Sequence, residues 1–312
     1  MRLSVEGSMA AVYLQQIING LTIGSVYALI ALGYTMVYGV LEMINFAHGE
    51  VYMVGAFVGL LALALLSPPS AVAGGGLLLV LGVTFLGAMA SCGALGVTIE
   101  RVAYRPLRAT SRLGPLISAL GVSLFIQNAV MLAIGARPKP FPQLIPKELY
   151  HVAGAVFTNV QLIILAAALA LMLALDQFVR RTRWGKAMRA VAQDAEAAGF
   201  MGVEVNTVVT LTFLIGSVLA AGAGIMVGIY YGIIDFFMGY VAGLKAFTAA
   251  VLGGIGNLRG AMLGGLLLGL AESFGAGFLG AHWRDAIAFA VLIAVLVLRP
   301  GGLLGEHLPE KV

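Results

Sequence analysis

The sequence is poor in charge and almost without cysteine. Only 10% of its 312 residues are Asp, Glu, Lys or Arg, whereas 61% are hydrophobic, and the mean hydropathy is +1.01. A soluble domain needs far more charge on its surface, so this composition excludes one and indicates a polytopic membrane protein. The one cysteine, Cys92, lies in an apolar run. It excludes an intrachain disulfide and gives no sign of a metal cluster.

Several familiar motifs are also missing. No GxxxxGK[ST] phosphate loop occurs, because Gly185-Lys186 lacks both the preceding glycine and the following hydroxyl residue. If ATP drives this protein, another polypeptide must therefore hydrolyse it. The N-terminus lacks the features of a cleaved signal peptide, so we expect the first span to direct its own insertion. The formal charge of +4 lies in short loops rather than on a basic face, which gives no indication of nucleic-acid binding.

Long charge-free runs predict eight to ten transmembrane helices, some of them short or broken. The run at 7–41 would rise about 50 Å as a helix, well beyond the roughly 30 Å of hydrocarbon, so we expect one full span and a broken segment there. The run at 51–99 is divided by SPPSAVAGGG. The predicted fold is an all-α polytopic membrane protein, a single transmembrane domain over 1–312. The expected spans are 12–32, 33–45, 52–66, 77–98, 113–136, 160–175, 207–231, 239–252, 260–276 and 286–298.

The distribution of basic residues predicts the orientation. The loops at 101–112 and 180–189 lie two crossings apart and together hold nine Lys and Arg residues, whereas the proline-rich loop at 137–148 between them holds three. Loops rich in Lys and Arg stay in the cytoplasm. We therefore expect both arginine loops and, by continued alternation, the C-terminus to be cytoplasmic.

One polar stretch, 180–206, interrupts the apolar sequence and reads RRTRWGKAMRAVAQDAEAAGFMGVEVN. Over 187–199 the apolar residues recur at spacings of one, three and four, which predicts a short helix with one weakly apolar face and one charged face. Gly199 and Gly202 would end this helix. Two interpretations stay open: a solvated connection between spans, or a docking helix that takes force from a soluble partner.

A second polar group, Glu42, Asn45, His48 and Glu50, lies between two apolar runs. Ionisable residues within spans usually face a cavity or a partner. Catalysis is disfavoured, because residues two apart do not share a helix face and no second histidine lies at ligand spacing. A proton relay is a further alternative. We expect the group to mark a cytoplasmic interface, with Glu and His at the water boundary.

Further along, charges and small residues punctuate apolar segments. Lys245 and Glu272 are isolated charges, so each marks either a translocation path or a segment end, and we expect Asp235 to cap an outer turn. Residues 45–59 faintly echo residues 257–269, which raises the hypothesis of an internal repeat of the kind common in transporters. Small residues at four-residue spacing predict close helix packing, at Gly224, Gly228, Gly260, Gly264 and Gly269.

The polar stretch carries a resemblance. Glu196-Ala197-Ala198 followed by Gly202 reads EAAxxxG, which resembles the cytoplasmic loop of binding-protein-dependent ABC importer permeases, where a coupling helix fits a groove on the ATPase. The IxLP part of that motif is missing, since VEVNTVVTL follows Gly202. The chain is more similar to the branched-chain amino acid ABC transporter permease family (LivH-like). That likeness lies in NGLTIGSVYALIALGYTMVYGVLEMINFAHGEVYMVGAF at 19–57, in residues 189–206 and in LKAFTAAVLGGIGNLRGAMLGGLLLGLAES at 244–273.

The resemblance implies a heteromeric importer in the bacterial inner membrane. Its other parts would be a second homologous permease, two ABC ATPase subunits that hold ATP and Mg²⁺, and a periplasmic substrate-binding protein. This chain would hold no catalytic residue, metal or cofactor, and would pass leucine, isoleucine or valine inward through the lipid bilayer. The residues that couple it to the ATPases would be Arg183, Trp184, Gly185, Arg189, Asp194, Glu196, Ala197, Ala198, Gly199 and Gly202. The candidate pathway or gate residues are Glu42, Asn45, His48, Glu50, Lys245, Asn257 and Glu272.

Other functions stay open at this point. Related permeases for urea and short amides look similar in the same segments. A proton- or sodium-driven carrier predicts uptake that survives without an ATPase, collapses with an uncoupler and depends on Glu42, His48 or Glu50. A membrane-embedded enzyme requires several of those residues to converge on a metal. Neither a carrier nor an enzyme explains the EAAxxxG stretch.

Overall fold

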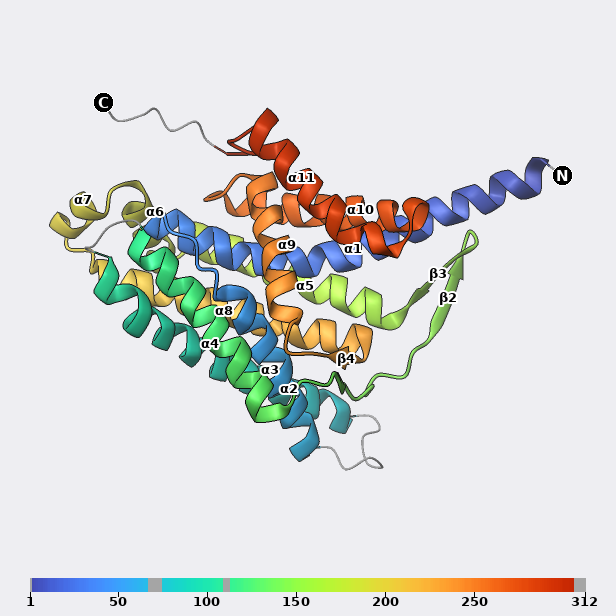
Figure 1. Ribbon diagram of the computed structural model, residues 1–312, viewed down its shortest axis with the longest axis horizontal. Coiled ribbons are helices and arrows are strands. Elements are labelled where there is room, and N and C mark those ends of the chain that lie inside the picture. Colours follow the sequence, from blue (N-terminus) through green and yellow to red (C-terminus); the bar gives the residue numbers. More distant parts are fainter. Residues whose placement is uncertain (1, 67–74, 109–112, 306–312) are drawn as a thin grey trace.

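The computed structural model describes residues 2–66, 75–108 and 113–305, and helices dominate it (Figure 1). Eight helices in these residues are long and apolar enough to cross a membrane, and a shorter apolar helix accompanies them. The chain is therefore a multi-pass membrane protein of the all-α class, as the charge-free runs predict. Seven of them correspond to α1 (Arg2–Leu41), α2 (His48–Leu66), α3 (Gly75–Ile99), α4 (Leu113–Ile134), α5 (Asn159–Arg181), α8 (Val205–Tyr231) and α10 (Leu258–Leu279), and the eighth, Ala281–Leu298, consists of a 3₁₀ turn and α11 (Arg284–Leu298).

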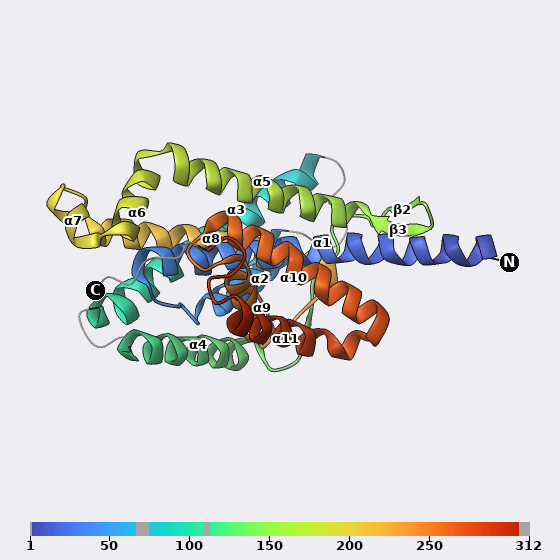
Figure 2. The same ribbon diagram turned by 90° about the horizontal axis from the view of Figure 1, so that it is seen from above.

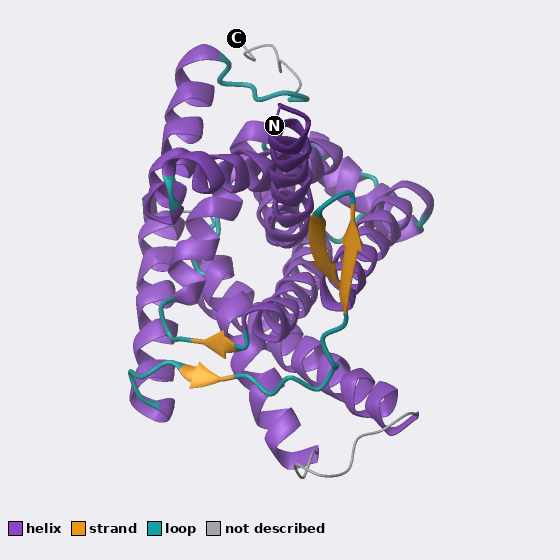
Figure 3. Cartoon of the chain, turned by 90° about the vertical axis from the view of Figure 1, so that its right-hand side faces the viewer, coloured by secondary structure: helices purple, strands orange, loops and turns teal. Residues whose placement is uncertain are grey.

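The remaining elements are short. The polar stretch forms α6 (Arg183–Gln193) and α7 (Ala195–Phe200), and the short apolar helix is α9 (Met238–Gly253). Two antiparallel strand pairs lie apart from each other (Figure 3): β2 (Leu149–Val152) with β3 (Ala155–Thr158), and β1 (Lys139–Pro140) with β4 (Ile233–Ile234). A π-helix (Glu100–Tyr104) and a 3₁₀ helix (Arg105–Leu107) continue α3, and a second 3₁₀ helix (Ala281–Trp283) precedes α11. The predicted break at 67–76 and Arg112 fall outside the described residues, except that Gly75 and Gly76 begin α3.

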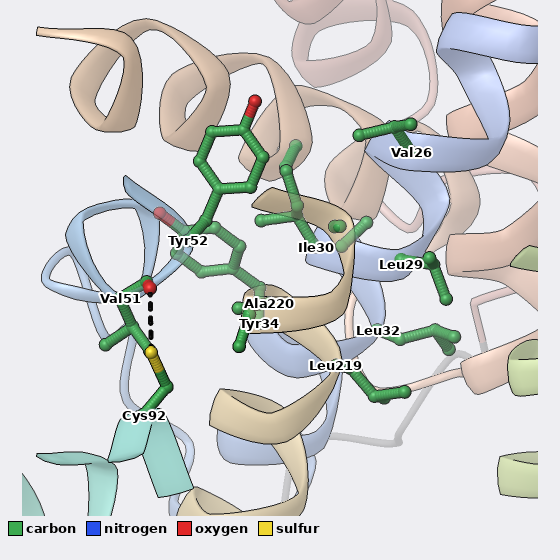
Figure 4. Packing of buried hydrophobic residues seen from close by; sticks show 14 of the residues in the cluster. Val26, Leu29, Ile30, Leu32, Tyr34, Val51, Tyr52, Cys92, Leu219 and Ala220 are labelled. Atoms are coloured by element: carbon green, nitrogen blue, oxygen red, sulfur yellow. Dashed lines mark hydrogen bonds between the residues drawn. The ribbon is translucent and has the colours of Figure 1, made fainter. Parts of the chain in front are cut away.

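The core lies around α1 and α8, which are the most buried spans, whereas α4 and α11 lie at the periphery. Figure 4 shows Val26, Ile30 and their neighbours on α1 packed against Tyr52 of α2 and Ala220 of α8. Cys92 is buried at the edge of this group, where its thiol donates to the Val51 carbonyl over 3.5 Å. Large apolar side chains on the outer helices face outward, as a hydrocarbon surrounding requires.

The expected break within the first apolar run is wrong, because α1 is one helix of 40 residues. It contains no proline, and Gly33 lies where any Cβ would overlap the His48 imidazole, so this glycine makes room rather than a hinge. The helix ends where Glu42 takes a φ of +54°. A helix of this length rises about 60 Å. Its N-terminal part therefore projects beyond the other helices, next to the β2–β3 hairpin (Figures 1 and 2).

Close helix contacts occur at glycines, where a Cβ would overlap the neighbouring segment. Such contacts let two backbones approach more closely than larger residues allow. α1 and α10 meet in this way at Gly24 and Gly269, and α2 and α9 meet at Gly49 and Gly239. The remaining positions singled out from the sequence face Tyr52 (Gly224), Phe141 (Gly228), Gly253 (Gly260) and Ala249 (Gly264).

Candidate functional site

The polar stretch folds as two helices, so the prediction of a single helix over 187–199 is wrong. α6 and α7 meet at Asp194, whose backbone is extended. Its Oδ1 accepts hydrogen bonds from the backbone N–H groups of Glu196 (3.0 Å) and Ala197 (2.9 Å). An aspartate that caps a helix in this way ends the preceding one. Beyond α7 the chain turns at Gly202, which has a φ of +86°.

α6 is held tightly against the end of α5. The Thr182 hydroxyl caps α6 by accepting a hydrogen bond from the Gly185 N–H over 3.0 Å. Any Cβ on Gly185 would overlap the backbone of Val179, and the Arg189 guanidinium donates to the Val179 carbonyl. Two of the residues predicted to couple the chain to a partner, Gly185 and Arg189, therefore fix the angle between α5 and α6.

α7 carries the most exposed part of the polar stretch. It lies at one extreme of the molecule, beyond the ends of the long helices (Figures 1 and 2). Ala198 is buried, whereas Phe200 and Met201 are 83% and 85% exposed. Two large apolar side chains side by side in a polar segment are typical of a protein-binding surface. The sequence analysis missed this pair, although its position directly after EAAG was a usable signal.

A buried carboxylate joins the first arginine loop to the start of α8. Glu100 has no exposed side-chain surface. Its carboxylate forms ion pairs with the guanidinium groups of Arg105 (2.9 Å) and Arg108, and it accepts a hydrogen bond from the Thr210 hydroxyl over 3.0 Å. Burial lowers the pKa of the Arg108 guanidinium, and the charge of Glu100 acts in the opposite direction. The arrangement ties the end of α3 to α8 close to the polar stretch.

His48 and Glu50 do not lie at a water boundary as expected. Each is 1% exposed, and only Glu42 of this group is exposed. The reason is that the first turn of α2 is covered by other helices. The Ser123 hydroxyl of α4 donates a hydrogen bond to Glu50 Oε1 over 3.2 Å. The rings of Tyr34 on α1 and His48 meet edge to face, with their centres 5.1 Å apart.

Asn45 holds the loop between α1 and α2. Its Oδ1 accepts hydrogen bonds from the Tyr104 hydroxyl and from the Ala47 N–H, both over 3.1 Å. Asn257 has a similar role at α10: its Oδ1 caps the helix at Gly260, and its amide donates to the Leu304 carbonyl over 2.8 Å. Both asparagines organise loops. In the part of the chain that the structure describes, no group of three or more His, Cys, Asp or Glu could hold a metal ion.

A cavity of about 360 Å³ opens between the end of α8 and the start of α9. Its volume falls within the range of roughly 300–1,000 Å³ that is usual for small-molecule sites. The wall is mostly apolar, with four tyrosines and four charged side chains. It consists of Thr22, Ile23, Val26 and Tyr27 of α1; Tyr52; Ile164; Val227, Tyr230 and Tyr231 of α8; Ile233, Asp235 and Phe237; Met238, Val241, Ala242 and Lys245 of α9; Glu272; and Arg284.

The two charges that were expected to be isolated meet in this wall. Lys245 Nζ lies 2.9 Å from Glu272 Oε1 and 2.8 Å from Asp285 Oδ1, and the Tyr27 hydroxyl donates to Glu272 Oε2 over 3.0 Å. Lys245 and Glu272 are buried, whereas Asp285 is 63% exposed. Their pairing depends on the packing of α9 against α10 and left no signal in the sequence. Asp235 caps its turn as expected, by accepting the Phe237 N–H over 2.8 Å.

A multi-pass helical bundle with a ligand-sized cavity between its helices is an architecture that membrane transport proteins use. The chain belongs to the family described as branched-chain amino acid transport system / permease component, which it matches over residues 16–296.

Curated relatives align with most of the chain or with part of it. The high-affinity branched-chain amino acid transport system permease protein BraD of Pseudomonas aeruginosa is 49% identical over 304 residues, which cover 96% of this chain and 98% of that protein. LivH of Escherichia coli K12, of the same description, is 47% identical over 306 residues, with the same coverage. The autoinducer 2 import system permease protein LsrC of Klebsiella pneumoniae is 39% identical over 137 residues, 42% of this chain and 40% of that protein. No solved structure matches the chain.

Proposed function

We propose that the chain is the permease subunit of a binding-protein-dependent ABC importer for leucine, isoleucine and valine, in the inner membrane of a bacterium. The observation that carries the proposal is the identity of 47–49% over 96% of the chain to permeases named for these substrates. ATP hydrolysis with Mg²⁺ belongs to two ABC ATPase subunits. A second homologous permease and a periplasmic substrate-binding protein complete the importer.

In this proposal α6 and α7 form the surface that docks on an ATPase. Phe200 and Met201 insert into the partner, while Arg183, Trp184, Glu196 and the rest of the coupling set surround them. Because Gly185 fixes α6 against α5, and α7 leads through Gly202 into α8, motion of the docked helices passes to both spans. α5 and α8 contribute Ile164 and Val227 to the cavity wall. Closure of the ATPases would therefore alter the cavity.

The assignment to an ATP-driven importer is tested by co-purification and by transport measurements. The tagged chain, extracted from native membranes in mild detergent, is expected to bring along two proteins with phosphate-loop sequences. After reconstitution, leucine uptake is expected to require internal ATP and to persist with an uncoupler. Accumulation by the chain alone, without nucleotide, would refute the ATP-driven assignment. Uptake of urea or acetamide instead of leucine would refute the substrate assignment and leave the coupling intact.

The orientation is tested by cysteine labelling, for which the buried Cys92 gives a low background. Tyr150→Cys in the β2–β3 hairpin and Glu196→Cys in α7 place thiols at opposite ends of the folded molecule. With the C-terminus in the cytoplasm, a membrane-impermeant maleimide is expected to label the hairpin variant in intact spheroplasts. The α7 variant should react only after permeabilisation. The reverse pattern would overturn the orientation.

A further inference from the structure

We infer that the cavity between α1, α8, α9 and α10 binds the amino acid in transit as a zwitterion, with Lys245 holding its carboxylate and Glu272 its ammonium group. The inference rests on the proposed function and adds a recognition site within the permease itself.

Stability does not account for this ion pair. The side chains of Lys245 and Glu272 are only 7% and 4% exposed, and charges taken out of water carry a desolvation cost that a partner only partly offsets. An apolar pair in such a place is often equally stable or more stable. The two helices already pack closely through glycine, at Gly264 against Ala249. Ionisable groups that are retained within spans characteristically face a substrate path, and both of these line the cavity.

The charges around the cavity suit a ligand that has both signs and no net charge. Two bases, Lys245 and Arg284, and two acids, Asp235 and Glu272, line the wall, and the more exposed Asp285 lies 2.8 Å from Lys245. A zwitterion can exchange partners with the Lys245–Glu272 pair and leave every charge compensated. An acidic or basic amino acid would bring a net charge into this buried site, and the desolvation cost disfavours it. Urea and short amides have no charge to offer either group.

The rest of the wall suits a branched aliphatic side chain. Ile23 and Val26 of α1, Ile164 of α5, Val227 of α8 and Val241 of α9 contribute apolar surface from four helices. Burial of aliphatic groups against such surface is favourable and has no directional requirement, so leucine, isoleucine and valine can share one pocket. The charged groups would hold the common part of the three substrates, and the apolar wall would accept the variable part.

The same geometry provides a way to release the ligand. Lys245 lies on α9 and Glu272 on α10, so the two halves of the charged site sit on different helices. α10 is packed to α1 at Gly24 and Gly269, whereas α9 is packed to α2 at Gly49. α9 and α10 also pack on each other at Gly264 and Ala249, so release would require this contact to slide, which would separate the group that holds the carboxylate from the group that holds the ammonium.

The first test is protection of an engineered thiol in the assembled importer without its binding protein. Ala242→Cys places a thiol in the cavity wall, and Tyr150→Cys in the hairpin is the control. Leucine at millimolar concentration is expected to slow the reaction of maleimide with the cavity thiol only. Leucinamide, which lacks the carboxylate, and 4-methylpentanoate, which lacks the ammonium group, are expected to give no protection. Equal labelling with and without leucine would overturn the inference.

The second test separates binding from folding. Lys245→Gln and the double variant with Glu272→Gln are expected to lower leucine uptake about tenfold or more, because hydrogen bonds to charged groups contribute on that order. Assembly with the ATPases and basal ATP hydrolysis should persist. The control is Arg259→Met. Arg259 lies on α10, as Glu272 does, but away from the cavity, and the substitution removes its 3.2 Å ion pair with Asp176 of α5. Its leucine half-saturation is expected to be unchanged.

These outcomes distinguish the inference from the proposed function. If the native importer takes up leucine but both Lys245 variants match it in rate and half-saturation, the cavity site is wrong and the importer assignment stands. If the native importer takes up no amino acid, the proposed function itself fails.

Discussion

Replacement of the two exposed apolar residues of α7 should detach the chain from its ATPase. Complete burial of a Phe or Met side chain contributes roughly 1.5–3 kcal/mol each. Phe200 and Met201 are 83% and 85% exposed, so nearly all of that surface is available to a partner. Ordering of a side chain at an interface costs roughly 0.5–1.5 kcal/mol. The pair should therefore contribute about 2–3 kcal/mol, and Phe200→Ser with Met201→Ser should weaken ATPase binding by about 30-fold to 160-fold.

The measurement is the affinity of the ATPase subunits for the permease pair in nanodiscs, followed by leucine uptake in proteoliposomes. The double variant should fold normally, because neither side chain packs in the core. Tyr150→Ser with Val152→Ser removes exposed apolar residues from the hairpin at the other end and should leave the ATPase affinity unchanged. If the α7 variant binds the ATPases as tightly as the native chain, α7 is not the docking element.

Two further predictions compare glycines on the same element or within the same loop. Gly202→Val should destabilise the turn after α7 by roughly 1–3 kcal/mol, because a β-branched residue is strained at a φ of +86°. Gly199→Ala is the control: Gly199 lies inside α7 with no neighbour near its Cβ, so this substitution should leave the stability unchanged. The assay is ATP-dependent leucine uptake together with the melting temperature of the purified importer, and equal behaviour of the two variants would contradict the argument. Gly33→Ala should lower the melting temperature in detergent, since its Cβ would overlap the His48 ring and overpacking costs about 1–3 kcal/mol. Gly39→Ala, on the same helix and 3.6 Å from its nearest neighbour, should leave it unchanged, and a matching loss there would remove the steric explanation.

The spans could be predicted where charge or turn residues mark their ends. α4 begins at Leu113 and α8 ends at Tyr231, as the sequence indicates. The expected break in α1 failed because the prediction compared the length of the charge-free run with the bilayer thickness, whereas the helix runs on unbroken and its N-terminal part projects beyond the other helices. The break at Asp194 was predictable in principle, since an aspartate before a run of good helix formers is a favoured N-cap.

The candidate site likewise has a part that could be predicted from the sequence and a part that could not. The polar stretch was visible because it contrasts with its surroundings, and its role in coupling stays a prediction. The meeting of Lys245 with Glu272 was not visible, because it depends on how α9 packs against α10 and on no local pattern. His48 and Glu50 were misplaced for a related reason: the covering residue Ser123 comes from a helix more than seventy residues away.

The unbroken course of α1 has a mechanical consequence. The helix contacts α6 and also forms one wall of the cavity, through Tyr27 and the preceding turns. α1 contains no proline and is one helix throughout, so a displacement of one end is expected to pass along it to the other. α1 packs on α10 over several turns, from Gly20 to Ala28, so a movement imposed at the polar end would be shared by α10 as well as by the far end of α1 beside the β-hairpin. One continuous helix would thus link the polar end of the molecule to the hairpin end.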